Sequence, residues 1–514
     1  MTGRQDGLKP MSKWHHMLSL PRLLTAIVFI SIFALAVQAP ADNDTWWHMA
    51  TGRLILQRAE LQFSDPFSHT RLGAPWINYS WLSDVLLYAV YALAGWAGLS
   101  LMVAGVVTLA FWLVYRQSAD YPFLRAFGVI WGAITSSLVW AARPHLLCFV
   151  WIALVAYLLD RYKRHNGRLL PWLPLIMLVW ANMHGGYYSV GLILMLCYLI
   201  GEALNRLSGH EVDPVLSAPR WRHLLLVTLL CILVIGINPN TWQLWAYPFR
   251  TVGIGVLRDF IQEWQSPDFH LIWQQPFLLL LFLIGLGLAR CGRVADFTDL
   301  MLCLVWAAWA LFAARNIAVF ALVSVPILVR YLGLAWERQR LIWQQAGRFQ
   351  TGLTRASRPL TPSNLTAACN GLLLIVVSLA ALVRIVSTLT PAALDQAVHE
   401  HLPVKAVTYV QAQRPAGPLF NSYNWGGYIM FKLWPDYPVF VDGRTDLYED
   451  AFLRQYLRIH LAEEGWSDLL LKYGIHLVLV ESDSPLARAL RQQPSWQEAY
   501  RDGVAAVFTR RAPV

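Results

Sequence analysis

The stretch LLTAIVFISIFALAVQAPADNDTWWHM, residues 23–49, joins an apolar run to two carboxylates, Asp42 and Asp44, and two indoles, Trp46 and Trp47. The apolar part is long enough to cross a bilayer as a helix. Carboxylates this close to hydrocarbon are costly unless they have partners or a task. The structural alternative is that they end the helix among lipid headgroups, where tryptophans form an ordinary aromatic belt. The stretch therefore predicts a membrane helix followed by a loop with a candidate site.

The composition of the 514-residue chain agrees with a membrane protein. Hydrophobic residues make up 57% and charged residues 14%, and the mean hydropathy is +0.43, which is too apolar for a soluble chain of this size. The six cysteines lie in or beside apolar runs without paired spacing, so no disulfide framework or zinc site is indicated. The net charge of +10 sits in short loops between apolar runs, as topology signals do, which argues against nucleic-acid binding.

Apolar runs of near-spanning length predict eleven crossings, in a polytopic α-helical membrane protein of about 11 to 13 transmembrane helices. The runs lie at about 21–40, 97–115, 122–141, 145–160, 170–185, 186–204, 222–238, 276–290, 298–314, 316–332 and 367–386. Segment 81–94 is a doubtful twelfth, because it is short and carries Asp84 in its first turn, so it could lie in the interface. The first run also resembles a signal peptide, since Ala39 and Ala41 follow it, but we favour an uncleaved span.

Basic residues set the expected orientation, because short cytoplasmic loops are enriched in Lys and Arg. With a cytoplasmic N-terminus, eleven spans place the most basic loops inside, at 161–168, 205–223, 290–293 and 330–358. The same count places loops 41–81 and 239–275, and everything after about residue 390, on the outer side. We therefore expect a multi-pass protein of the bacterial cytoplasmic (inner) membrane with an extracytoplasmic C-terminal domain.

The chain thus divides into a multi-span domain, 1–390, and a soluble α/β domain, 391–514. In the latter we expect strands at PLFNSY (418–423), YPVFVDGR (437–444), IHLVLVES (475–482) and GVAAVFTRR (503–511), and helices at AFLRQYLRIHLAEE (451–464), WSDLLLKYG (466–474) and SPLARALRQQ (484–493). Gly426 and Gly427 permit a close backbone approach or a tight turn, and we favour the turn. Asp442 and Arg444 follow a predicted strand, where ligand sites are common, but they could equally form a structural pair.

Polar residues interrupt other apolar runs on the same expected outer side. They are Arg143 and His145, Asn182 and His184, and Arg315 and Asn316. In isolation such residues usually snorkel or cap a helix. Their common side, next to the loop that carries Asp42 and Asp44, predicts a shared outward-facing cavity that has an acid to take a proton and cations to hold a phosphate.

The second outer loop, 239–275, mixes tryptophans with charged residues, including Glu263 and Trp264. One interpretation is an amphipathic helix that lies on the membrane surface. The functional interpretation is a cover over the cavity that contributes Glu263 or a tryptophan on which a sugar stacks.

The segments DNDTWWHMATGRLIL, DPFSHT, APWINYSWL and AGWAG together resemble the first outer loop of membrane glycosyltransferases of the GT-C superfamily. The resemblance implies a catalytic aspartate in this loop, a polyprenyl-phosphate-linked sugar donor and a site at the outer face of the bilayer. The segment WGGYIMFKLWPDYPVFVDGRT is also faintly similar to the WWDYG neighbourhood of oligosaccharyltransferase catalytic subunits. It lacks that aspartate, because Gly426 and Gly427 follow Trp425, so recognition of an acceptor peptide does not carry over.

Residue by residue, the resemblance implies Asp44 as the catalytic base, with Asp42 as its partner and His48 beside it. Asp42 and Asp44 also form a DxD-like pair that could hold a divalent metal such as Mg or Mn, although some members of the superfamily work without one. The expected donor-phosphate ligands are Arg143, His145, His184 and Arg315. The expected acceptor or sugar ligands are Glu263, Trp264, Trp425, Asp442 and Arg444.

The predicted function is transfer of a sugar from a polyprenyl-phosphate carrier in the membrane lipid to an extracytoplasmic lipid, glycan or protein acceptor. Two other classes stay open. A flippase or transporter of lipid-linked sugars would bind the headgroup without chemistry, but the internal repeats common in transporters are not found in the sequence. A non-catalytic scaffold would present the C-terminal domain to partners and fill the cavity with side chains.

Overall fold

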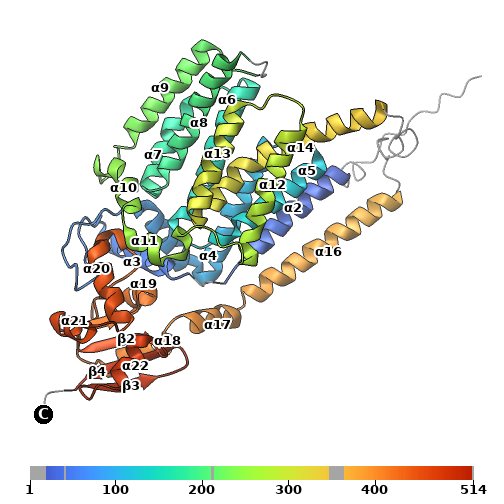
Figure 1. Ribbon diagram of the computed structural model, residues 1–514. Helices are drawn as coiled ribbons and strands as arrows, with labels where there is room; N and C mark the ends of the chain where they lie inside the picture. Colours follow the sequence, from blue (N-terminus) through green and yellow to red (C-terminus); the bar gives the residue numbers. More distant parts are fainter. Residues whose placement is uncertain (1–18, 40–41, 210–213, 346–363, 512–514) are drawn as a thin grey trace, which may run out of the picture.

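A computed structural model describes residues 19–39, 42–209, 214–345 and 364–511 (Figure 1). Ala41 and parts of two predicted inner loops, 210–213 and 346–358, lie outside these ranges. A bundle of long helices forms most of the molecule, and the C-terminal elements pack against one end of it (Figure 1). Helix α16, Asn364–Thr388, runs along the outside of the bundle towards the C-terminal elements.

A helix lies over each of the eleven predicted runs. Besides α16 these are α2 (Leu20–Ala36), α4 (Trp81–Gln117), α5 (Pro122–Ser136), α6 (Pro144–His165), α7 (Leu173–Met183), α8 (Tyr188–Ser208), α9 (Ala218–Val234), α12 (Gln275–Arg290), α13 (Phe297–Phe312) and α14 (Ile317–Gln345). Proline in the first turn begins many of them, where its missing N–H costs nothing. Among the described residues seven helical segments are long and apolar enough to cross a membrane, and three more are apolar but shorter. The chain is a multi-pass membrane protein, and the count of eleven stays a prediction.

Helix α4 contains both the run at 97–115 and the doubtful segment at 81–94. The two parts meet at a kink at Gly95, whose φ of 58° and ψ of −151° are accessible essentially only to glycine. Asp84 in the first turn is fully buried. The segment is therefore the first part of a bent helix, and its position relative to the membrane stays a prediction.

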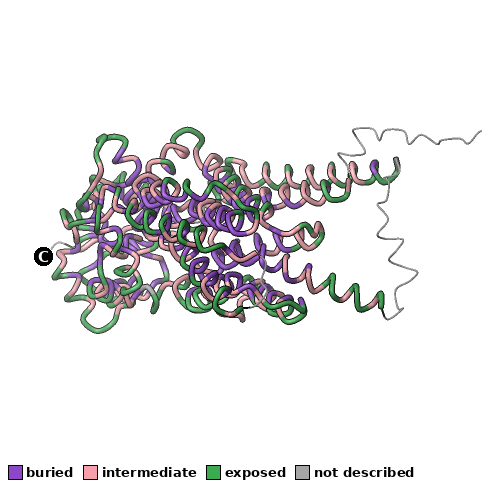
Figure 2. Tube along the Cα trace, turned by 90° about the horizontal axis from the view of Figure 1, so that it is seen from above, coloured by how far each residue is buried: buried purple, intermediate pink, exposed green. Residues whose placement is uncertain are grey.

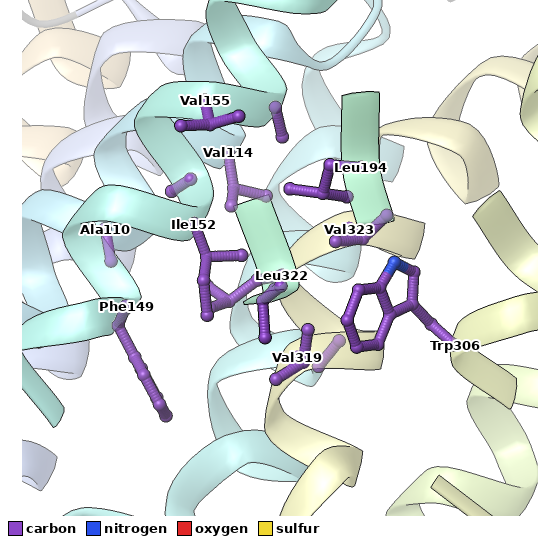
Figure 3. Close-up of a cluster of buried hydrophobic side chains, with 14 of the residues drawn as sticks. Ala110, Val114, Phe149, Ile152, Val155, Leu194, Trp306, Val319, Leu322 and Val323 are labelled. Atoms are coloured by element: carbon purple, nitrogen blue, oxygen red, sulfur yellow. The ribbon is translucent and has the colours of Figure 1, made fainter. Parts of the chain in front are cut away.

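The core of the bundle surrounds the first half of α14, in which every side chain from Ile317 to Val329 is buried. A helix that is apolar on all sides belongs at the centre of a bundle. Its Val319, Leu322 and Val323 meet side chains of α4, α6, α8 and α13, such as Ile152 and Trp306 (Figure 3). Figure 2 shows the contrast with α16, whose side chains are mostly exposed and free to contact lipid.

A buried ion network lies at the end of α6 that is farthest from its start at Pro144. Lys163 contacts Glu202 and lies 2.6 Å from Asp296, and Arg164 lies 2.9 Å from Asp299. Some charges expected in inner loops are therefore buried between helices. Since α6 has 22 residues, about 33 Å separates this network from the start of the helix.

The outer loops fold into short helices between the bundle and the C-terminal elements (Figure 1). The first loop forms α3 (Asp44–Arg58), and the second forms α10 (Gln243–Val252), α11 (Gly255–Phe260) and the 3-10 turns η3 (Gln262–Trp264) and η4 (Ile272–Gln274). Other 3-10 turns are η1 (Ser137–Val139), η2 (Leu170–Trp172) and η5 (Ala314–Asn316).

The C-terminal elements form a four-stranded sheet with helices around it. The strands β1 (Leu419–Asn421), β2 (Leu477–Glu481), β3 (Trp496–Arg501) and β4 (Ala505–Arg510) have the order β1-β2-β4-β3. β1 and β2 are parallel and the other pairs are antiparallel. The helices are α17 (Pro391–His401), α18 (Val404–Gln413), α19 (Gly426–Leu433), α20 (Thr445–His460), α21 (Trp466–Lys472) and α22 (Pro485–Arg491), with the turn η6 (Tyr423–Trp425) before α19.

Three of the four predicted strands are confirmed as β1, β2 and β4, and the three predicted helices as α20, α21 and α22. The strand predicted at 437–444 is wrong: this segment makes only a single bridge, from Val439 to Ser68 of the first outer loop. Its backbone pairs with the loop at Val439, while the Phe440 ring packs against Phe420 and Phe452 of the C-terminal elements. Strand β3 was not predicted, and the domain division at residue 390 stays a prediction.

Candidate active site

A buried ion cluster joins the first outer loop to the C-terminal elements. The Arg444 guanidinium donates to Asp65 of the loop and to Asp442, both at 2.7 Å, and the Tyr448 hydroxyl also donates to Asp442 at 2.7 Å. Arg444 also lies 4.7 Å from the centre of the Trp76 ring. The cluster holds one guanidinium and two carboxylates, and each carboxylate also accepts hydrogen bonds from neighbouring N–H or O–H groups, as burial requires. Asp442 and Arg444, considered as acceptor ligands, are thus fully buried in a structural pair.

Two glycines of the C-terminal part let its backbone approach α3. A methyl group on Gly427 would lie 2.9 Å from both Asn43 O and Trp47 N, and one on Gly426 would overlap the backbone at Val441. Gly426 has helical φ and ψ of −54° and −44°, so the tight turn favoured from the sequence is wrong. These glycines serve close packing at the start of α19.

Gly443 brings the backbone of the C-terminal part directly onto Asp44. A methyl group at this position would overlap Asp44 Oδ1 and would lie 2.8 Å from Trp47 Nε1. Asp44 is the first residue of α3. The carboxylate predicted as a base is therefore confined between its own helix and a backbone that comes from the other end of the chain.

Asp42 caps helix α3 and holds an arginine. Its Oδ1 accepts from the backbone N–H groups of Asp44 and Thr45, at 2.9 and 3.1 Å, and its Oδ2 accepts from Arg143 Nε at 2.6 Å. Arg143 precedes a proline, which holds it in extended conformation at the start of α6. Burial would raise the pKa of Asp42, but the charge and hydrogen bond of Arg143 lower it below its ordinary value.

For Asp44 the net effect on the pKa is the opposite of that for Asp42. Its Oδ2 lies 3.1 Å from Arg143 Nη1, yet burial raises the pKa of Asp44 to about 7, because the carboxylates of Asp42 and Glu263 oppose the effect of the arginine. A carboxyl group that titrates near neutral pH can accept a proton and release it again.

Glu263 of the second outer loop bridges two arginines. Its Oε2 lies 3.5 Å from Arg143 and its Oε1 3.7 Å from Arg315, and Arg315 also lies 4.4 Å above the Trp264 ring. Against burial, the two arginines lower the pKa of Glu263. The two guanidinium groups therefore face one position that a carboxylate occupies in this state.

The three predicted histidines have different hydrogen-bond partners. His48 Nδ1 lies 2.7 Å from Asp84 Oδ1, and His145 Nε2 lies 3.0 Å from Val139 O. His184 Nδ1 accepts from the backbone N–H groups of Gly186 and Tyr187, at 3.1 and 3.2 Å. That nitrogen must be unprotonated, so His184 is neutral and can offer only its Nε2–H as a donor.

One cavity of about 1710 Å³ connects most of these side chains. Its polar lining includes Asp44, His48, Arg143, His145, His184, Glu263, Trp264 and Arg315. Asp42 lines a smaller neighbouring cavity of about 220 Å³. Trp425 lines neither: it is buried, and its indole donates to His401 O at 3.1 Å.

Part of the cavity lining is apolar. It consists of side chains of α8, α9, α10 and α13, among them Leu196, Ile232, Phe249, Trp309 and Phe312. Phe249 and Phe312 are 80% and 63% exposed, so this apolar part of the lining extends to the surface of the helix bundle.

The geometry does not fit a divalent metal held by Asp42 and Asp44. Both oxygens of Asp42 already accept hydrogen bonds, and Arg143 lies against both carboxylates. Within the described ranges no group of three or more His, Cys, Asp or Glu side chains is arranged to hold a metal ion. We derive no step through a metal.

Several lining residues were not predicted: Tyr79, Tyr247, Tyr423, Thr445 and Asp446. Tyr79 and Tyr247 stack with their ring centres 4.6 Å apart. Asp446 had no sequence signal: it lies before the helix predicted at 451–464, and the observed helix α20 begins earlier, at Thr445.

The fold and the cavity define a class: a polytopic membrane protein whose charged site lies between a helix bundle and a small α/β unit. Among solved structures this architecture is found in the archaeal oligosaccharyltransferase AglB from Archaeoglobus fulgidus. In complex with an inhibitory peptide and a dolichol-phosphate, AglB aligns with a TM-score of 0.54 and 12% identity over 91% of this chain and 69% of its own. AglB tethered with an acceptor peptide gives 0.53 at 12% identity, over 91% and 70%.

Arabinofuranosyltransferase AftD from Mycobacteria aligns over 100% of this chain and 41% of its own at 15% identity, with a TM-score of 0.49, and adds nothing to the inference. No protein-family model and no curated protein sequence matches the chain. At these identities the likeness to AglB shows the fold. The chain has the same fold as AglB, and the expected fold class, a polytopic α-helical membrane protein with a C-terminal α/β unit, is confirmed.

Proposed function

We propose that the protein is a glycosyltransferase that moves a sugar from a polyprenyl-phosphate carrier to an acceptor outside the cytoplasm. One observation carries the proposal: in a single cavity, the Asp44 carboxylate lies 3.1 Å from Arg143, and Glu263 lies between Arg143 and Arg315. A proton acceptor and two phosphate-binding cations are thus available side by side. The fold shared with AglB supports the same assignment.

In the proposed reaction Asp44 takes the proton of an acceptor hydroxyl. The hydroxyl oxygen forms a bond to the anomeric carbon while the bond from that carbon to the phosphate oxygen breaks. The phosphate leaves with its polyprenyl chain, held by Arg143 and Arg315, and the neutral His184 can donate one further hydrogen bond. The apolar part of the cavity lining would hold the polyprenyl chain.

Glu263 occupies the place that the donor phosphate would take between the two arginines. Donor binding would therefore displace it together with the turn η3. This turn is attached to the bundle through Gln265 O, which accepts from Ala314 N at 2.9 Å. Movement of the second outer loop is thus part of the proposal, with the site on the extracytoplasmic side of a bacterial inner membrane.

The test is transfer of a labelled sugar from a polyprenyl-phosphate donor by purified protein in detergent, without any ion gradient. Asp44→Asn removes the base and keeps the shape, so turnover should fall at least 100-fold. The control is Asp468→Asn, an exposed carboxylate on α21, which should keep full turnover. Undiminished transfer by Asp44→Asn would refute the assignment, and wild-type transport that needs a gradient would favour the flippase.

A further inference from the structure

The wall of the cavity that the C-terminal part contributes has its own chemistry. Its polar lining consists of Ser422, Tyr423, Asn424, Thr445, Asp446 and His460. The arginines among the described lining residues, Arg143, Arg258 and Arg315, all come from the bundle or from the second outer loop. This wall therefore offers hydroxyl, amide, imidazole and carboxylate groups, and no guanidinium or ammonium group.

Asp446 is the charged group of this wall. Its carboxyl group lies close enough to the Tyr247 hydroxyl to affect its titration, and burial raises the pKa of Asp446 to about 6. At neutral pH the group is therefore mostly ionised and can accept from further hydroxyls. Tyr247 stacks on Tyr79 at 4.6 Å and 29°, which places aromatic rings beside the carboxylate.

The wall is also close to the base. Asp446 follows Gly443 by three residues, and Gly443 lies against Asp44. The Tyr423 hydroxyl bonds to Thr445 Oγ1 at 2.9 Å. Tyr79 and Tyr423 both experience the charge of Asp44. A molecule held on this wall can thus present a hydroxyl to Asp44.

We propose that this wall is the acceptor subsite, and that the acceptor is a neutral, hydroxyl-rich glycan. The Asp446 carboxylate would accept from adjacent sugar hydroxyls, and the rings of Tyr79 and Tyr247 would contact the C–H face of the sugar. A phosphorylated or carboxylated acceptor would meet the charge of Asp446 on a wall whose described lining residues include no guanidinium or ammonium group. The assignment as an acceptor site rests on the proposed function. The preference for a neutral glycan rests on the side chains that line this side of the cavity.

The experiment measures glycan binding to the full-length protein in detergent by saturation-transfer NMR, without donor. The probes are neutral tetrasaccharides built from glucose, mannose, galactose or arabinose, a tetragalacturonate as the anionic probe, and a hexapeptide. We expect at least one neutral tetrasaccharide to bind, and its affinity to fall at least tenfold in Asp446→Asn. Asp468→Asn is the matched control and should bind like wild type. If Asp446→Asn does not fold, Tyr79→Leu removes the aromatic face and should weaken the same binding.

Three results would overturn the inference. The first is binding of the anionic probe or the peptide when no neutral tetrasaccharide binds, and the second is binding of a neutral tetrasaccharide that Asp446→Asn and Tyr79→Leu leave unchanged. The third is the absence of binding by any probe. Because the binding experiment contains no donor, its result does not depend on whether the protein catalyses the proposed transfer. A wild-type protein that binds neutral glycan but never consumes the polyprenyl-phosphate donor would refute the function and leave the glycan site in place.

Discussion

Gly443→Ala tests whether the C-terminal part shapes the catalytic carboxylate. The added methyl group would overlap Asp44 Oδ1 and would lie 2.8 Å from Trp47 Nε1. Gly443 does not have a positive φ, so the substitution acts by crowding and not by backbone strain. Either the carboxylate or the segment around Gly443 must move.

The displacement needed to restore ordinary contact is on the order of 1 Å, and a misplacement of this size costs about 100-fold in rate. Crowding of a packed site costs about 1 to 3 kcal/mol of stability, which leaves the protein folded. We therefore expect turnover in the detergent transfer assay to fall about 100-fold, with a small drop in the melting temperature.

The matched control is Gly503→Ala in the same part of the chain, because a methyl group there meets nothing within 4 Å. It should keep both turnover and melting temperature. Wild-type turnover in Gly443→Ala would refute the reasoning, since it would mean that the position of Asp44 does not depend on the C-terminal backbone.

Two further predictions concern charge. The proposed base Asp44 acts only when ionised, so kcat/KM should rise as the pH passes upward through about 7. Glu263→Gln removes a neighbouring negative charge, which lowers the pKa of Asp44 and should move this rise to lower pH. A pH-rate profile that is unchanged in the variant would contradict the placement of the two carboxylates. Asp65→Ala leaves Arg444 paired with Asp442, but it removes the buried acceptor of Arg444 Nη1 and of the Phe67 and Ser68 N–H groups. Since each unsatisfied buried donor costs about 1 to 3 kcal/mol, the variant should be destabilised by about 3 to 5 kcal/mol, visible as a lower melting temperature. The exposed Asp468→Ala should change stability by less than about 0.5 kcal/mol, and equal melting temperatures for the two variants would exclude a stabilising role of the pair.

Hydropathy located the helices well, because the length and apolarity of a membrane helix are properties of one continuous segment. The kink in α4 was not predictable in this way, since Gly95 adopts its unusual conformation only when the two halves of the helix have packed. Strand β3, WQEAYR, is largely polar and exposed, so alternation of apolar residues gave no signal for it. The segment at 437–444 resembled a strand because it is apolar, but its backbone forms only a single bridge, from Val439 to Ser68.

In the candidate site, too, local sequence patterns predicted some residues, whereas contacts between distant segments could not be predicted. Asp42, Asp44 and Arg143 could be predicted from charges next to apolar runs, and the structure brings them into contact. The pairing of Arg444 with Asp65 could not be predicted, because the partners are 379 residues apart in the sequence and no local pattern connects them. Asp446 lacked a signal for the same reason: its neighbour Tyr247 comes from the second outer loop.

The pairing of Asp65 with Arg444 also sets an order of events during synthesis. At about 5 to 20 residues per second, a separation of 379 residues means that the first outer loop waits roughly 20 to 80 s for its counterpart to leave the ribosome. Until that segment has been synthesised, the wall beside Asp44 that contains Gly443 is missing. Under the proposed function, a nascent chain therefore cannot transfer sugar before the far end of the polypeptide has arrived.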